Sequence, residues 1–199
     1  VIYNSFEEHK GDDAITVYRN EMIQKLKSSE QQLKSSFGLL ADFLFAAAFD
    51  NMQYFYLSSA DHLQKLSELS QQQGAHPLIT DCANELLQYI KTPGGVIDNT
   101  QYGILGYADD AYFIQAMLSN LHQAGILDST SWNIDWVKIN AGIEVVFNII
   151  GNGIKERLDN NINAYCQQLI EKYNPQAAQQ QNLQQQEEKL QQMKDDVWK

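Results

Sequence analysis

The sequence predicts an all-α protein: a multi-helix bundle of about six helices with an appended Gln-rich C-terminal helix. Apolar residues recur every three or four positions along most of the chain, which is the period of an amphipathic helix. The 199 residues include only 3 prolines and 11 glycines, so helix breakers are few. No stretch alternates apolar and polar residues, and no sheet is expected. We expect residues 12–173 to form the bundle domain and residues 175–199 to form the appended helix.

The charge and the cysteines limit the classes of partner and cofactor. The formal net charge is −11 and the pI is about 4.6. Nucleic acids and anionic lipids bind positive surfaces, so neither is expected here, whereas a basic protein would be attracted. Cys82 and Cys166 are far apart and have no Cys or His nearby at metal-ligand spacing. They predict buried free thiols, and no cofactor is expected.

No segment is predicted to insert into a membrane. The longest apolar block, residues 43–49, is much shorter than a bilayer-spanning helix. A cytoplasmic location is expected. The chain begins at Val1 rather than at an initiator Met, so an excised signal or anchor stays open.

The first predicted helix covers residues 12–44. Asp12 or Asp13 can accept backbone N–H groups as its N-cap. Breaks are expected near residues 28–29 or 35–36, where serine pairs interrupt the pattern. The apolar stripe that predicts this helix consists of Ile15, Tyr18, Met22, Leu26, Leu33, Phe37, Leu40 and Leu44.

The next segments are predicted to lie centrally in the bundle. Residues 43–49 are apolar on every side of a helix, which is typical of a helix in the core. An aromatic-rich stretch follows, and Ser58 or Ser59 is expected to cap a new helix. This helix is expected to end shortly before Gly74, because glycine suits the left-handed backbone of the C′ position that follows a helix.

Four further helices are predicted in the second half of the bundle. Residues 78–90 form one that stops at the Pro-Gly-Gly segment, and residues 96–106 form a loop. A second helix runs over residues 109–124 and closes at a glycine. Residues 128–131 are expected to cap the third, whose stripe begins at Trp132. A Gly-Asn-Gly segment at residues 151–153 interrupts the pattern before the fourth, which ends at Tyr173.

Residues 103–121 form the stretch whose residues indicate a role other than packing in the core. A Gly-rich turn runs through residues 106–110 directly into a patterned helix. Carboxylates at a helix start accept backbone N–H groups and meet the positive end of the helix dipole, so Asp109 and Asp110 are first interpreted as caps. The alternative is a metal site of Asp98, Asp109 and Asp110, because carboxylate oxygens are ligands for hard cations.

The same stretch resembles the YkvA-like family of small bacterial helical domains. The likeness covers residues 84–121 and rests on Gly106, Tyr107, Asp109 and Asp110. The loop prolines typical of that family are missing, and an alanine stands where the family has a larger apolar residue. The resemblance implies a helical fold, and it implies no particular activity.

The histidines and tryptophans carry weaker signals. His62, His76 and His122 are scattered without ligand spacing, so surface or capping roles are expected. Trp132 and Trp136 lie one turn apart and are expected in the core or lining a groove, with an aromatic ligand pocket as the alternative.

The Gln-rich tail is the predicted partner-binding element. Its apolar residues form a narrow seam that is too thin to bury much surface alone. We expect the tail to dock on the bundle, on another protein or on a second copy of the chain, giving a homo-oligomer. The expected binding residues are Leu183, Leu190, Met193, Val197 and Trp198.

The sequence therefore favours a non-catalytic role with no catalytic residues. We expect an acidic helical protein–protein interaction module, such as an adaptor, a chaperone-like protein or a regulatory subunit. One alternative is an immunity protein or antitoxin that neutralises a basic toxin by charge complementarity. The other is a cation-dependent hydrolase that uses Asp109 and Asp110.

Overall fold

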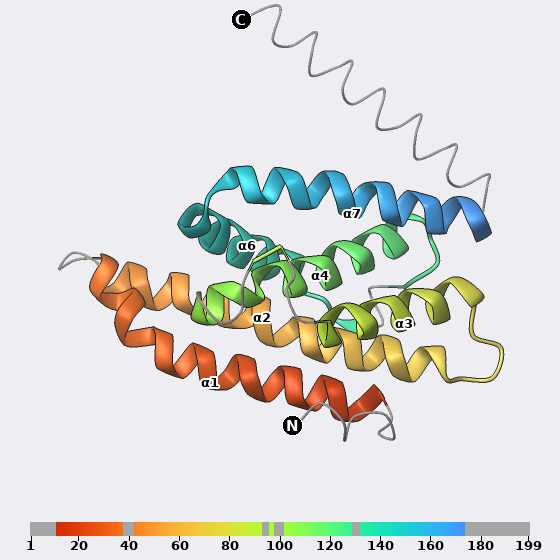
Figure 1. The fold of residues 1–199 in the computed structure, drawn as a ribbon, viewed down its shortest axis with the longest axis horizontal. Coiled ribbons are helices and arrows are strands. Elements are labelled where there is room, and N and C mark those ends of the chain that lie inside the picture. Colours follow the sequence, from red (N-terminus) through yellow and green to blue (C-terminus); the bar gives the residue numbers. More distant parts are fainter. Residues whose placement is uncertain (1–10, 38–41, 93–95, 98–101, 129–131, 174–199) are drawn as a thin grey trace, which may run out of the picture.

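The computed structural model confirms the all-α helical bundle (Figure 1). It describes residues 11–37, 42–92, 96–97, 102–128 and 132–173. These residues contain six α-helices and no strand. The helices are α1 (Gly11–Phe37), α2 (Asp42–Ser70), α3 (Pro77–Lys91), α4 (Ala108–Gln123), α6 (Trp136–Ile150) and α7 (Asn152–Tyr173), and the 3₁₀ helix η3 (Gly103–Tyr107) leads into α4.

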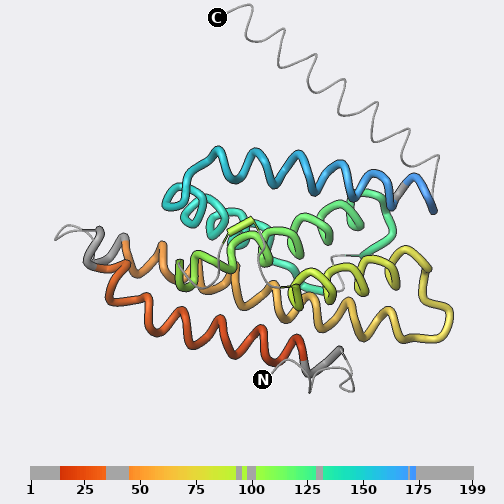
Figure 2. The backbone as a smooth tube through the Cα atoms, viewed as in Figure 1, coloured from red at the N-terminus to blue at the C-terminus, as the bar shows by residue number. Residues whose placement is uncertain are grey.

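Helix α2 is the hub of the bundle, because it packs against α1, α3, α4 and α6. Figure 2 shows α1 and α7 on opposite sides of the body, with α4 between α2 and α7. Helix α7 covers α4, α6 and the adjoining end of α3. Helix α4 is buried along most of its length, from Ala108 to Leu121. This burial places both acidic residues of its first turn inside the molecule.

A glycine allows the closest approach between α2 and α6. A Cβ atom added to Gly142 would lie 2.4 Å from the carbonyl oxygen of Asn51 and 2.5 Å from Cβ of Phe55. No side chain can be accommodated at such distances without moving the backbone. The contact explains why Gly142 occupies the middle of a helix, where glycine is otherwise unfavourable.

The first two helices differ from the prediction. Helix α1 ends at Phe37, before the predicted end at residue 44, and α2 starts at Asp42. Helix α2 then runs without interruption through Ser58 and Ser59, so these serines do not cap a new helix. Their hydroxyls donate to the carbonyl oxygens of Phe55 and Tyr56 within the same helix. This local bond satisfies a buried serine without ending the helix.

Two further details refine the predicted pattern. Ala46 and Ala47 are exposed, so the segment predicted to be apolar on every side has a solvent face. Helix α6 is capped by Asp135, whose carboxylate accepts the N–H of Lys138 at 3.0 Å. Residues 129–131 of the predicted capping segment lie outside the described residues. The predicted interruption after α6 is confirmed, since Gly151 has a φ of 104° between α6 and α7.

The Gln-rich tail, with its predicted binding residues, lies outside the described residues, as does Asp98. Within the part of the chain that is described, none of the helices has both the length and the apolar character needed to cross a bilayer.

Candidate functional site

Asp109 and Asp110 lie in the first turn of α4 and are buried, with exposed fractions of 0% and 6%. The N-cap residue is Tyr107, which makes no side-chain capping bond. One oxygen of Asp109, Oδ2, accepts the backbone N–H of Ile97 at 3.2 Å and the hydroxyl of Tyr89 at 3.4 Å. The carboxyl thus connects the start of α4 to the preceding loop and to α3.

Burial raises the pKa of the Asp109 carboxyl, although backbone N–H groups around it act in the opposite direction. Its other oxygen, Oδ1, is fully buried and has no hydrogen-bond partner among the described residues, and the same holds for the hydroxyl of Tyr56. Within the described residues, no three His, Cys, Asp or Glu side chains gather as a metal site. The cation hypothesis for Asp98, Asp109 and Asp110 stays a prediction.

A surface depression with a volume of about 510 Å³ lies between α4, α6 and α7. We call it the amide groove. Its lining combines apolar side chains of α6 with side-chain amides from all three helices. Its lining residues are Tyr112, Gln115, Ala116, Ser119, Asn120, His122, Gln123, Trp136, Ile139, Asn140, Ile143, Asp159 and Asn163.

Two amides of the amide groove have no hydrogen-bond partner within the described residues. Asn140 of α6 and Asn163 of α7 are exposed and make no internal bond there. Asn120 and Gln123 donate to Ala116 O and Ser119 Oγ, at 2.9 and 3.4 Å. Each of these amides retains its carbonyl oxygen as a further acceptor. The amide groove therefore offers neutral donors and acceptors beside apolar side chains.

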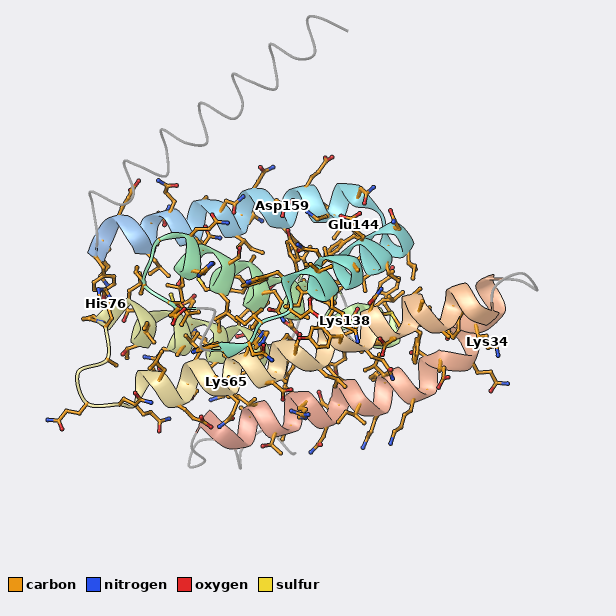
Figure 3. All side chains as sticks on the ribbon, turned by 180° about the vertical axis from the view of Figure 1, so that it is seen from behind. Lys34, Lys65, His76, Lys138, Glu144 and Asp159 are labelled. Atoms are coloured by element: carbon orange, nitrogen blue, oxygen red, sulfur yellow. The ribbon has the colours of Figure 1, made fainter. Side chains whose placement is uncertain are left out.

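The carboxylate in the amide groove is already engaged. Asp159, labelled on α7 in Figure 3, accepts the hydroxyl of Tyr112 and forms an ion pair with Lys155 at 2.9 Å. Burial, reinforced by Asp159, raises the pKa of Tyr112 to about 12, so this phenol stays protonated at neutral pH. The side chains that line the amide groove are therefore mainly hydrogen-bonding groups rather than a free acid or nucleophile.

The histidines and cysteines considered in the sequence analysis lie partly where they were expected. His76 caps α3, because its Nδ1 accepts the N–H of Leu78 at 3.2 Å. His62 is buried, at 4% exposure, contrary to the surface or capping role expected for it. Cys82 and Cys166 are buried free thiols, as predicted, and burial raises the pKa of each to about 12.

Sequence reasoning missed Asn140 and Asn163, because an exposed asparagine on a helix has no distinctive pattern. It did single out Trp136, one of the two expected core or groove residues, and this indole lines the amide groove. Comparison of the chain with protein-family models, with curated proteins and with solved structures gives no match.

Proposed function

We propose that the protein is a non-catalytic interaction module that binds an amphipathic helix of another protein in the amide groove. The role belongs to the class of adaptors, chaperone-like proteins and regulatory subunits. A helix laid in a groove buries its apolar side chains on the floor while its polar flanks meet the walls. The observation that carries the proposal is a groove that combines apolar side chains with partly unoccupied amides.

The lining of the amide groove suits this occupant. Ile139 and Ile143 line the amide groove but are almost fully buried, so the partly buried indole of Trp136 offers the apolar contact, a group of the kind enriched at interfaces. Amides neither ionise nor attack a substrate, and they bond well to neutral polar side chains. A partner helix with glutamine, asparagine or serine beside its apolar stripe therefore matches the amide groove best.

The net charge of −11 favours the second candidate, an immunity protein or antitoxin directed against a basic toxin. The two candidates differ in their response to salt. Binding through charge complementarity weakens steeply as salt increases, because mobile ions screen exposed charges beyond about 8–10 Å. Binding in the neutral amide groove should change little.

The test is affinity capture from the native cell with matched variants. N140K/N163K places two long cationic side chains in the amide groove. N148K/N160K introduces the same change at exposed asparagines of α6 and α7 outside it. We expect N140K/N163K to lose a partner that the wild type and N148K/N160K retain, in both low and high salt. Equal capture by both variants, or a partner released by salt alone, would reject binding in the amide groove.

A further inference from the structure

A second depression lies on the face formed by α2 and the residues that lead into α6. We call it the α2 hollow, and its volume is about 420 Å³. Figure 3 shows Lys65 on α2 and Lys138 on α6 on this side of the molecule. The lining residues are Asp50, Gln53, Tyr54, Leu57, Ser58, Asp61, His62, Lys65, Trp132, Asn133 and Lys138. This volume suits a small ring compound.

A chain of hydrogen bonds fixes the state of the imidazole in the α2 hollow. The hydroxyl of Ser58 donates to Phe55 O, so its oxygen accepts Nε2 of Gln115 at 3.0 Å. The amide oxygen of Gln115 then faces Nδ1 of His62 at 3.1 Å. Since that oxygen only accepts, Nδ1 of His62 carries the proton. Nε2 is left as the hydrogen-bond acceptor of a neutral ring.

Nε2 of His62 has no hydrogen-bond partner in the described part of the chain, and it is not among the fully enclosed unpartnered atoms there. It therefore opens to the α2 hollow that its residue lines. Burial lowers the pKa of His62 and outweighs the opposite effect of its hydrogen bond to Gln115, and the nearby charge of Lys65 adds to the lowering. The ring is thus neutral at pH 7 and available as an acceptor.

The walls are aromatic and are held in place. The ring of Trp132 lies 6.5 Å from that of His62, and Lys65 Nζ donates to the carbonyl oxygen of Trp132 at 3.3 Å. Tyr54 lies on α2, with Lys138 Nζ at 5.0 Å from its ring centroid. Flat aromatic walls favour a flat aromatic ligand.

Among the described residues, one cation of the α2 hollow has no ion-pair partner. Lys138 pairs with Asp50 at 2.7 Å, and Asp61 pairs with Arg19. Lys65 has no acidic partner among the described residues, and its ammonium keeps donors beyond the one given to Trp132 O. An anionic group of a ligand would supply an ion-pair partner for Lys65.

We propose that the α2 hollow binds a small aromatic carboxylate whose ring bears an N–H or O–H donor. The ring lies between Tyr54 and Trp132, its donor bonds to Nε2 of His62, and its carboxylate meets Lys65. This inference is independent of the amide groove and of the protein partner proposed for it.

Calorimetric titration of the full chain tests the ligand class. Indole-3-acetate has the ring donor and the carboxylate, 1-naphthylacetate has only the carboxylate, and 3-methylindole has only the donor. We expect saturable binding of indole-3-acetate and at least about tenfold weaker binding of each of the other two. Equal affinity for all three compounds, or no saturable heat with indole-3-acetate at millimolar concentration, overturns the proposal.

Variants test the two named contacts. K65M should weaken the binding of indole-3-acetate about tenfold, whereas K91M, which removes an exposed lysine that does not line the α2 hollow, should not. H62N keeps a donor toward Gln115 but removes the Nε2 acceptor, so it should lose the preference over 1-naphthylacetate. If H62N does not fold, the ¹⁵N shift of His62 Nε2 in the wild type decides. It should move with indole-3-acetate only, and an unchanged shift at saturation contradicts the assigned contact.

Discussion

At position 109 a buried carboxyl accepts two hydrogen bonds that an amide oxygen would also accept. D109N should therefore keep the bonds from Ile97 and Tyr89 and leave the free energy of unfolding at pH 7 unchanged or higher. D109A removes the buried acceptor of both bonds, which should cost about 1–3 kcal/mol. Denaturant unfolding of both variants measures the difference. A D109N protein that is as unstable as D109A would show that the negative charge itself is needed.

The raised pKa of Asp109 gives this comparison a pH dependence. Below the pKa of the unfolded chain the carboxyl is neutral in both states, and burial carries no charge penalty. As the pH rises through the higher pKa of the folded state, the wild type loses stability from this group. The stability of D109N relative to the wild type should therefore increase from acidic to neutral pH. Unfolding curves across this range provide the measurement, and the opposite slope would contradict the burial argument.

Asp109 also shows which features of a single residue can be predicted from the sequence. Its place at the start of a helix was predictable from the Gly-Tyr-Ala-Asp-Asp run. Its bonds to Ile97 and Tyr89 were not, because they join segments that the local pattern does not relate. Gln115 is a similar case. It is a buried amide that bonds to His62 and also lines the amide groove, so one side-chain pair joins the two depressions.

Among the elements, the crossing of α2 and α6 allows a matched test with two glycines. G142A should lower the free energy of unfolding by about 1–3 kcal/mol or more, because the new Cβ meets the backbone of α2. G153A should raise it by about 0.5–1 kcal/mol, since Gly153 lies in α7 with open space around it and alanine favours the helix. Thermal and denaturant unfolding check both variants. A harmless G142A would mean that the two helices are farther apart than described.

Helix existence followed from the apolar period, whereas helix ends depended on tertiary context. The interruption at Gly151 was predicted because glycine has a strong local effect. Ser58 and Ser59 were misread as caps, since a serine bonds equally well to a carbonyl within a continuing helix. The amide groove forms only when α4, α6 and α7 come together, so the sequence pattern of a single helix does not predict it.

For the whole molecule, the appended tail gives the clearest prediction. Removing residues 175–199 should leave the melting temperature of the bundle nearly unchanged, because the described helices pack around a common set of buried apolar residues. It should reduce self-association or partner binding, since the seam containing Leu183 and Leu190 is removed. Light scattering and pull-down provide the readouts. Unfolding or aggregation of the shortened chain would place the tail in the core.

The acidic charge also acts at the scale of the whole molecule. A net charge of −11 accelerates encounters with basic partners over a distance set by salt, but it does not select a binding site. The amide groove would supply the selection by shape and hydrogen bonding. A partner can therefore depend on salt for its rate of association and still depend on Asn140 and Asn163 for the stability of the complex.

Site-specific photo-crosslinking in the native cell shows whether the amide groove holds a protein partner. A photoreactive phenylalanine analogue is placed at position 123, which is exposed and lines the amide groove, or at position 160, which is exposed on α7 outside it. We predict a covalent adduct with another protein from position 123, lost when Asn140 is replaced by lysine, and none from position 160. Adducts from position 160 alone, or from neither position in a folded protein, would contradict the account.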